Sequence, residues 1–419
     1  DQYFELIENS ALAPSISCSF SKPRQEAVYS IYSENFLPDI QQYLERTYPK
    51  GLYKHQADAL NAIQEGKNVL IITGTSSGKS LCYQLPVLNE ILQHNSSTAL
   101  FLFPTKALAE DQLKSLHNIS DSLNIEGNKK LIAATYDGDT SQRRRTTIRN
   151  ATNIILSNPD MLHIGILPQH TRWERFLINL KFIVIDEVHT YRGIIGSHFA
   201  NVLRRLKRLL NFYGSHPQMV LTSATLSNAQ EFSEKLIGER FQIINEDFSF
   251  HEGRKYYFIN PPLIDKSLGL RKSMTEQTIE ITSMLMTAKI QLIIFSRTRK
   301  TVEITLRKLR ERFERSAENF RGYRSGYLPN ERRAIEEGLR SGEVRTVVST
   351  NALEMGIDMG KVDATILMGY PGSISSFYQQ TGRAGRRNRQ GISVLVASPS
   401  PIDQYIIQHC DYLSKGSPE

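Results

Sequence analysis

The chain reads Thr73-Gly74-Thr75-Ser76-Ser77-Gly78-Lys79-Ser80 between an apolar strand expected at 69–73 and a helix expected at 81–93. A phosphate-binding loop requires this context, because backbone N–H groups and the helix N-terminus then point at the anion. There Lys79 reaches the β- and γ-phosphates, Ser80 ligates Mg²⁺, and the phosphates are lined by Thr75, Ser76, Ser77 and Gly78. Thr73 stands where glycine is usual, and the alternative is a Gly/Ser-rich turn.

Outward from this loop, short β-branched runs alternate with longer amphipathic stretches. Strands are expected at 69–73, 99–103, 131–136, 154–157, 182–186 and 219–223, with helices at 81–93 and 107–116. Alternation of this kind predicts an α/β fold, with a mostly parallel sheet covered by helices on both faces.

The pattern weakens over 245–273, which contains Pro261 and Pro262, and then restarts. Strands are expected again at 291–296, 346–349, 365–368 and 393–397, with helices at 301–313 and 331–341. We therefore predict an N-terminal extension over 1–50 with a short helix at 36–48, a nucleotide-binding domain over 51–250, and a second α/β domain over 251–419.

Composition narrows the class of protein. The 419 residues carry a formal net charge of +8, which favours an anionic partner such as nucleic acid. No apolar run is long enough to span a bilayer. The three cysteines, Cys18, Cys82 and Cys410, are far apart, so we expect neither a disulfide framework nor a zinc site, and a reducing cytoplasm.

A second motif follows the expected strand at 182–186. Asp186-Glu187-Val188-His189 places carboxylates at the carboxyl end of a strand, where α/β sheets bind ligands. Asp186 is expected in the magnesium shell, Glu187 as general base for the attacking water, and His189 as a relay to the nucleic-acid site. The alternative is an Asp-Glu pair that caps a helix.

A third motif, in the second domain, is rich in arginine and glycine: Gln379-Gln380-Thr381-Gly382-Arg383-Ala384-Gly385-Arg386-Arg387. Fixed guanidinium groups stabilise charge that develops on a transferred phosphoryl group. We expect Arg383 and Arg386 to complete the ATP site when the two domains close. The alternative is a basic helix face that contacts phosphates or solvent.

Together these motifs resemble those of the superfamily 2 helicases, from about residue 37 to residue 397. The resemblance also rests on Leu52-Tyr53-Lys54-His55-Gln56 and Thr222-Ser223-Ala224-Thr225. It implies two tandem RecA-like domains and ATP with Mg²⁺ as cofactors. It also implies that Gln56 reads adenine, Asp358 contacts the ribose, and Gly356 belongs to the cofactor-binding site. Gln379 is implied to position the water, and Thr222, Ser223 and Thr225 to couple the ATP site to the strand.

Three stretches are similar to the MrfA/YprA-type DNA helicases, relatives of the fungal Hrq helicase: residues 136–140, 186–193 and 350–358. Tyr323-Arg324-Ser325-Gly326 also fits that type. The resemblance implies 3′-to-5′ DNA unwinding linked to damage repair. That family continues into a C-terminal domain with four metal-binding cysteines, which this sequence lacks. We therefore expect either a shortened chain or a protein partner that supplies the module.

Nucleic acid is expected to cross loop tips of both domains, because hydroxyls, amides and backbone N–H groups there suit phosphate contacts. The same residues are also ordinary turn formers. The candidates are Pro104, Thr105, Lys106, Gly138, Asp139, Ser157 and Asn158 in the first domain, and Arg297, Tyr323, Thr350 and Asn351 in the second.

The stretch 199–210 predicts a basic amphipathic helix, which is either a DNA-facing flank or, as we favour, a packed helix with a solvated charged face. Trp173 is expected to pack rather than to stack on a base. Three other functions remain open beside a DNA helicase: a remodelling ATPase that needs a partner, an RNA helicase, and a nucleic-acid clamp with an inactive ATP site.

Overall fold

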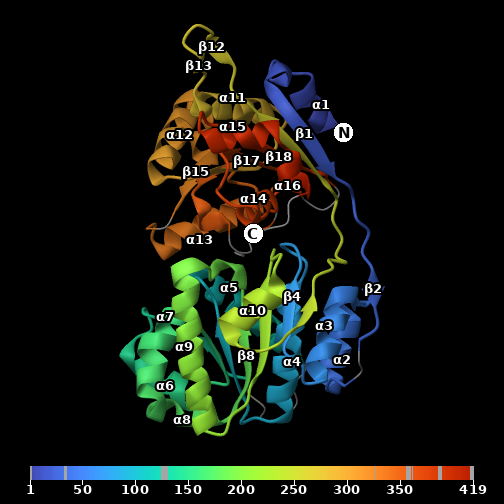
Figure 1. The fold of residues 1–419 in the computed structure, drawn as a ribbon, viewed down its shortest axis with the longest axis vertical. Coiled ribbons are helices and arrows are strands. Elements are labelled where there is room, and N and C mark those ends of the chain that lie inside the picture. Colours follow the sequence, from blue (N-terminus) through green and yellow to red (C-terminus); the bar gives the residue numbers. More distant parts are fainter. Residues whose placement is uncertain are drawn as a thin grey trace. The chain divides into compact units, whose positions relative to one another are not determined.

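In the computed structural model, the described residues are 2–32, 35–123, 131–324, 326–354, 360, 362–385 and 389–415. They form two compact units (Figure 1). One comprises Glu26–Ser249 and is called the 26–249 unit. The other combines residues 1–25 with 250–419 and is called the C-terminal unit.

The 26–249 unit is built on a seven-stranded sheet in which every neighbouring pair is parallel. Its strand order is β10-β4-β9-β8-β5-β7-β6. The bounds are β4 Val69–Ile72, β5 Thr98–Leu102, β6 Ala133–Thr135, β7 Ile154–Ser157, β8 Leu180–Ile185, β9 Gln218–Ser223 and β10 Gln242–Ile244.

Helices cover both faces of this sheet, as Figure 1 shows. Side chains alternate between the faces, so Val69 and Ile71 enter one core while Leu70 and Ile72 enter the other. The first core is closed by α2 Pro38–Thr47, α3 Lys54–Gln64, α4 Lys79–Gln93 and α5 Lys106–Ser122. The second is closed by α6 Gln142–Ala151, α8 Glu174–Ile178, α9 Gly193–Phe212 and α10 Ala229–Ile237.

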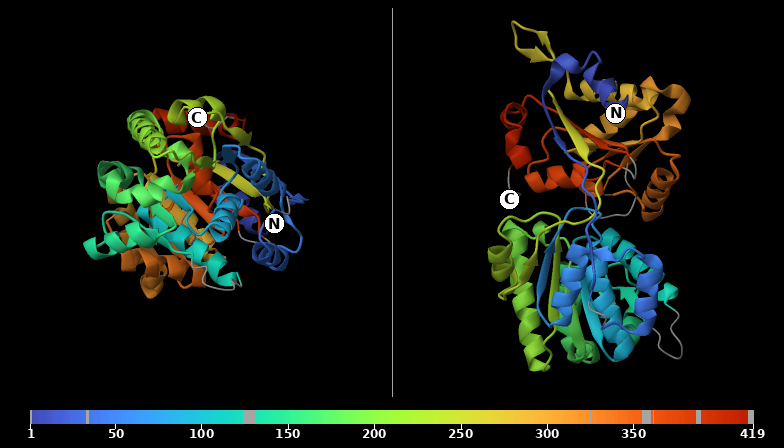
Figure 2. Two further views of the ribbon diagram at one scale, coloured as in Figure 1. Left: turned by 90° about the horizontal axis from the view of Figure 1, so that it is seen from below. Right: turned by 90° about the vertical axis from the view of Figure 1, so that its right-hand side faces the viewer.

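The C-terminal unit repeats this plan with the order β1-β11-β18-β17-β14-β16-β15. All neighbouring pairs are parallel except β1 with β11, which is antiparallel. The bounds are β1 Ile16–Lys22, β11 Arg254–Ile259, β14 Leu292–Ser296, β15 Phe320–Tyr323, β16 Thr346–Ser349, β17 Ala364–Met368 and β18 Gly391–Val396. Figure 2 shows the N-terminal strand running beside its neighbour in this sheet.

One face of this second sheet packs on α1 Gln2–Glu8, α11 Met274–Thr287 and α12 Arg299–Arg312. On the other face, Phe377 of α14 Ile374–Thr381 stacks near Tyr256 and Phe258, with ring centroids 5.7 and 6.1 Å away. The remaining helices are α13 Pro329–Ser341, α15 Pro401–Gln408 and α16 Asp411–Lys415. A small exposed hairpin, β12 Leu263–Asp265 with β13 Leu270–Arg271, projects from the unit (Figures 1 and 2).

The predicted extension over 1–50 is divided between the two units, because residues 16–22 pair with β11 of the C-terminal unit. The region 245–273, expected to be a connection, contains that strand. Arg254–Ile259 is buried along its length except at its first two residues, which are half-buried. Gly253 before this strand and Pro261 and Pro262 after it are typical of a connection, so the sequence did not predict a strand here. The strand nevertheless pairs with a neighbour on each side.

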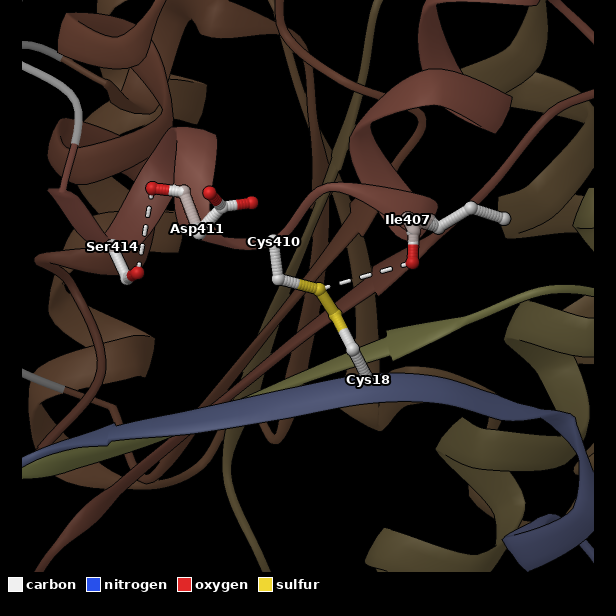
Figure 3. Close-up of a disulfide and its surroundings, with 5 residues drawn as sticks. All are labelled: Cys18, Ile407, Cys410, Asp411 and Ser414. Atoms are coloured by element: carbon white, nitrogen blue, oxygen red, sulfur yellow. Dashed lines mark hydrogen bonds between the residues drawn. A yellow bond between two sulfur atoms is a disulfide. The ribbon is translucent and has the colours of Figure 1, made fainter.

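The expectation of no disulfide is wrong for one cysteine pair. Cys18 of β1 and Cys410, which precedes α16, are joined in a disulfide with a Cα–Cα distance of 6.6 Å (Figure 3). That distance lies within the range that disulfides span. Cys82 is a free thiol and is buried, as is usual for a cysteine that packs like a small hydrophobic residue.

Among the described residues, no helix has both the length and the apolar character needed to cross a membrane. The predicted basic helix over 199–210 is part of α9, with Leu203, Leu206 and Leu210 in the core. Lys207 donates to the Ile237 carbonyl and pairs with Glu239, so part of its charged face is engaged within the unit. Trp173 is fully buried beside Tyr136, as expected for a packing residue.

Candidate nucleotide and nucleic-acid sites

The loop after β4 closes around the Lys79 side chain. Its ammonium donates to the carbonyls of Thr73 and Gly74, both at 2.7 Å. Ser76 and Gly78 adopt positive φ angles of 65° and 81°, which bend the backbone around the lysine. The hydroxyls of Thr73 and Ser77 lie 2.6 Å apart within the loop. Ser80 is half-exposed in the first turn of α4.

Two residues of α3 contact backbone carbonyls of this loop through their side chains. Gln56 donates to the Gly78 carbonyl at 3.0 Å and accepts from the Tyr53 N–H at 3.0 Å. A Cβ at position 78 would lie 2.3 Å from the Gln56 amide nitrogen and would also strain the positive φ, so glycine suits this position. His55 Nε2 lies 3.0 Å from the Ser77 carbonyl, and His55 Nδ1 accepts from the Phe248 N–H. Burial lowers the pKa of His55, which favours the neutral ring that this pairing needs.

Asp247 also contacts the loop, and the sequence analysis did not identify it. Its carboxylate accepts from the Gly74 N–H at 2.8 Å and from the Ser249 N–H at 2.9 Å. The residue lies 173 positions after Gly74, so no local spacing pointed to it. The loop is thus held by groups from α3 and from the segment that ends the unit.

The acidic motif lies at the carboxyl end of β8, next to β9. Asp186 accepts hydrogen bonds from the Thr222 hydroxyl and from the Glu187 N–H. Burial, followed by the neighbouring charge of Glu187, raises the pKa of Asp186 to about 6. Two buried carboxylates side by side are typical of a site that receives a cation or a proton.

Glu187 sits at the centre of a chain of polar contacts. It has a positive φ of 52°, which is uncommon for a residue other than glycine and occurs often at functional sites. His189 Nδ1 lies 3.4 Å from a Glu187 carboxylate oxygen and 3.1 Å from the Ser223 hydroxyl. Ser223 in turn donates to the Thr225 carbonyl. The structure therefore gathers all four predicted coupling residues, His189, Thr222, Ser223 and Thr225, around the acidic pair.

The loop tips predicted to bind nucleic acid are partly engaged in local structure. Thr105 and Asn158 cap helices, accepting from the N–H groups of Leu108 and Met161. Ser157 is buried and donates to the Tyr136 carbonyl. Lys106 forms an exposed ion pair with Asp139 at 2.6 Å, beside Gly138. Only the Lys106 and Asp139 side chains therefore combine exposure with charge in this set.

In the C-terminal unit, a cavity of about 170 Å³ opens at the carboxyl ends of β14 and β17. It is lined by Arg297, Asn351, Glu354, Ser376 and Gln380, among others. Thr350 caps the short helix at 351–353 through its hydroxyl. Tyr323 is buried and donates to Glu336, and burial raises the pKa of its phenol, so its side chain is not placed to contact a nucleic acid.

The described part of the arginine motif is buried and makes side-chain hydrogen bonds within the C-terminal unit. Gln379 and Arg383 are both buried, and Arg383 Nη2 donates to the Glu354 carbonyl at 3.2 Å. The Glu354 carboxylate accepts from the Ser376 hydroxyl at 2.5 Å and from the Gln380 amide at 2.9 Å. Glu354 lies in the stretch 350–358, but no sequence pattern assigned a role to it. Arg386, Gly356 and Asp358 lie outside the described residues.

Two family models match the chain, one in each unit. DEAD/DEAH box helicase matches residues 53–232, and helicase conserved C-terminal domain matches residues 276–388. The first match contains the phosphate loop and the acidic motif. The second contains the arginine motif, including Arg383 and Arg386.

Curated relatives include the ATP-dependent helicase YprA of Bacillus subtilis, 48% identical over 371 residues, covering 88% of this chain and 49% of YprA. The ATP-dependent helicase HRQ1 of Saccharomyces cerevisiae is 38% identical, covering 96% of this chain and 38% of HRQ1. The chain thus spans half or less of the length of these two relatives.

Among solved structures, that of the DUF1998 helicase MrfA bound to DNA has a TM-score of 0.92 and 44% identity, covering 99% of this chain and 55% of that chain. The RNA-bound Dbp5 of S. cerevisiae has a TM-score of 0.69 at 18% identity, covering 92% and 93%, and supports the fold alone. The chain is therefore a member of the superfamily 2 DEAD/DEAH box helicases, of the YprA, Hrq1 and MrfA type, with two RecA-like units.

Proposed function

We propose that this chain is the motor of an ATP-dependent DNA helicase that translocates 3′ to 5′ in DNA repair or genome defence. The observation that carries the proposal is the juxtaposition in one unit of a lysine-filled phosphate loop and a buried Asp186–Glu187 pair. Lys79 binds the β- and γ-phosphates in place of the Thr73 and Gly74 carbonyls, and Glu187 accepts the proton of the attacking water.

The residues fit a magnesium ion that arrives with the nucleotide. Asp186 would supply an oxygen ligand at the strand end. Burial, and then the charge of Glu187, raises its pKa to about 6, and a bound cation would favour the ionised carboxylate again. Ser80 supplies a hydroxyl from the first turn of α4. The ion would neutralise charge on the phosphates, and Lys79 and the loop N–H groups would hold them in place.

DNA is proposed over RNA on the strength of the relatives. MrfA, at 44% identity, was solved bound to DNA, and it was also solved bound to DNA and AMPPNP. Lys106 and Arg297 are exposed cationic residues at predicted loop tips. Side chains of this kind suit contacts with phosphates that do not depend on the base sequence.

Steady-state ATP hydrolysis tests the proposal. We expect single-stranded DNA to stimulate hydrolysis several-fold more than RNA of the same length, and the stimulation to fall steeply with salt, because binding depends on neutralising phosphates. Equal stimulation by DNA and RNA would assign the chain to RNA-acting or unselective motors. Hydrolysis without stimulation by either polymer would contradict a nucleic-acid motor.

The chain spans half or less of the length of YprA and HRQ1, so unwinding by this chain alone needs a separate measurement. Strand displacement is measured on DNA forks with a 3′ or a 5′ single-stranded tail. Displacement only from the 3′ tail supports a self-sufficient helicase of the proposed polarity. Stimulated hydrolysis without displacement supports a motor that requires a partner module, and a preference for the 5′ tail contradicts the polarity.

A further inference from the structure

One arginine holds the backbone on both sides of Arg383. Arg254, the first residue of β11, donates from Nη2 to the carbonyl of Gly382 at 3.3 Å and to that of Ala384 at 2.6 Å. Its Nη1 donates to the Tyr256 hydroxyl at 3.3 Å, which fixes the plane of the guanidinium. The two carbonyls belong to residues 128 and 130 positions away in sequence.

The other carbonyls of this turn, residues 381–384, also have donors. The Thr381 carbonyl accepts from the Ala384 N–H at 3.0 Å, and the Arg383 carbonyl accepts from the Val362 N–H at 3.0 Å. Arg254 is thus the side chain that completes the set. The turn follows α14, whose C-terminal carbonyls form the negative end of the helix dipole, so a cation there is stabilising.

Glu354 holds the same turn from another direction. Its carboxylate binds Ser376 and Gln380 of α14, and its carbonyl binds the Arg383 guanidinium. The backbone also packs tightly, because a Cβ at Gly391 would lie 2.8 Å from the Gly385 nitrogen. The turn therefore has little freedom as long as Arg254 and Glu354 are in place.

We propose that Arg254 is a positioning residue for ATP turnover, which it supports by fixing the 381–384 turn and with it the direction of the Arg383 side chain. The proposal rests on the proposed function and on the role expected for Arg383 from the sequence, which is to stabilise charge on the transferred phosphoryl group. Stabilisation of that kind depends on donors already aligned before the reaction, so loosening the turn lowers the rate rather than nucleotide binding. A lysine supplies the charge but not the planar fork.

The test compares Arg254→Ala, Arg254→Lys and the control Arg271→Ala with the unaltered chain. Arg271 is a matched control because its guanidinium also donates to a backbone carbonyl, that of Pro261 at 2.9 Å, but in the β12–β13 hairpin. For Arg254→Ala we expect kcat to fall about tenfold or more. Its KM for ATP should stay near that of the unaltered chain, because the phosphate loop lies in the 26–249 unit.

Two further readouts separate positioning from a merely structural role. Arg254→Lys should recover part of kcat, and millimolar methylguanidinium should raise the kcat of Arg254→Ala without affecting Arg271→Ala. Hydrogen exchange should accelerate in peptides covering 381–385 of Arg254→Ala, and this readout does not require activity. Unchanged exchange together with unchanged kcat overturns the inference, as does a matched loss of kcat in Arg271→Ala.

Failure of the proposed function has a different signature. If the unaltered chain hydrolyses no ATP with DNA, the motor assignment fails, while hydrogen exchange still reports whether Arg254 holds the turn. If the unaltered chain is active and Arg254→Ala matches it in both kcat and exchange, only the positioning role fails.

Discussion

The two sheets share one order over six strands. They differ at β4 and β11, both in the segment that follows the strand and in the strand's outer neighbour. β4 and β11 occupy equivalent places, since β4-β9-β8-β5-β7-β6 matches β11-β18-β17-β14-β16-β15. β4 leads into the phosphate loop, whereas β11 leads into Asn260-Pro261-Pro262. The outer neighbour of β4 is the parallel strand β10, and that of β11 is the antiparallel strand β1, which carries a disulfide.

The difference shows that the strand order alone does not make a nucleotide site. The loop needs glycines that allow Gln56 and Asp247 to approach the backbone, and a lysine to fill it. The equivalent segment of the C-terminal unit, Asn260-Pro261-Pro262, contains two prolines, which lack the N–H groups that bind phosphate. That unit instead places Glu354 and Arg383 in buried contacts.

The largest expected effect is on catalysis in the 26–249 unit. Glu187→Gln should lower ATP turnover on the order of 100-fold or more, because the amide cannot accept a proton from water, while nucleotide binding is retained. ATP hydrolysis and binding of a fluorescent ATP analogue are measured together. Glu231→Gln is the matched control, since Glu231 is exposed in the same unit. Full turnover in Glu187→Gln would show that Glu187 is not the general base.

The next effect is on stability in the C-terminal unit. The disulfide closes a loop of 392 residues, and Cys18→Ser should cost about 2–4 kcal/mol in the free energy of unfolding of this unit. Reductant should lower the midpoint of thermal unfolding of the unaltered chain to that of the variant, and leave the variant unaffected. Identical midpoints with and without reductant would contradict a bond between Cys18 and Cys410.

A pH-dependent effect should follow from the acidic pair. The pKa of Asp186 is about 6 in the folded protein, above its ordinary value of 3.8, so the folded state disfavours the ionised carboxylate. The resulting loss of stability is absent below the ordinary value of 3.8, builds as pH rises from there to about 6, and is complete above about 6. Asp186→Asn should therefore stabilise the nucleotide-free protein by roughly 2–3 kcal/mol at pH 8 and by little at pH 4. Chemical unfolding at the two pH values checks this, and an equal difference at both would contradict it.

The smallest effect concerns the exposed pair at the loop tips. Asp139→Asn frees Lys106 from its 2.6 Å ion pair and removes a negative charge near the proposed strand path. DNA affinity should rise about two- to fivefold at low salt, within the range of exposed ion pairs. Fluorescence anisotropy with labelled DNA measures it. Asp121→Asn, an exposed acid of the same unit, should change affinity less.

Much of the fold was predictable because its central strands are runs of buried β-branched residues. The predicted strands at 154–157 and 346–349 coincide with β7 and β16, and the helix at 81–93 begins two residues after the start of α4. Four strands of the two main sheets were missed, namely β1, β10, β11 and β15. β1 alternates half-buried and exposed residues at a sheet edge, and β11 lies between glycine and proline that resemble a connection.

The residues of the candidate nucleotide site could be picked out from the sequence where they are neighbours along the chain, as in the 73–80 loop and the 186–189 segment. Contacts over long separations were not. Asp247 reaches Gly74 across 173 residues, Arg254 reaches Gly382 across 128, and Cys18 meets Cys410 across 392. Such pairs are set by how strands and helices pack, and the spacing of single residues carries no signal for them.

ATP hydrolysis by Lys79→Ala, measured beside Lys67→Ala, tests whether the 73–80 loop holds the nucleotide. Lys67 is an exposed lysine of the same unit that pairs with Glu65, so its loss removes the same charge without touching the loop. With saturating single-stranded DNA, we expect near-complete loss of hydrolysis in Lys79→Ala and little change in Lys67→Ala. Equal hydrolysis by the two variants would contradict a nucleotide held on the 73–80 loop.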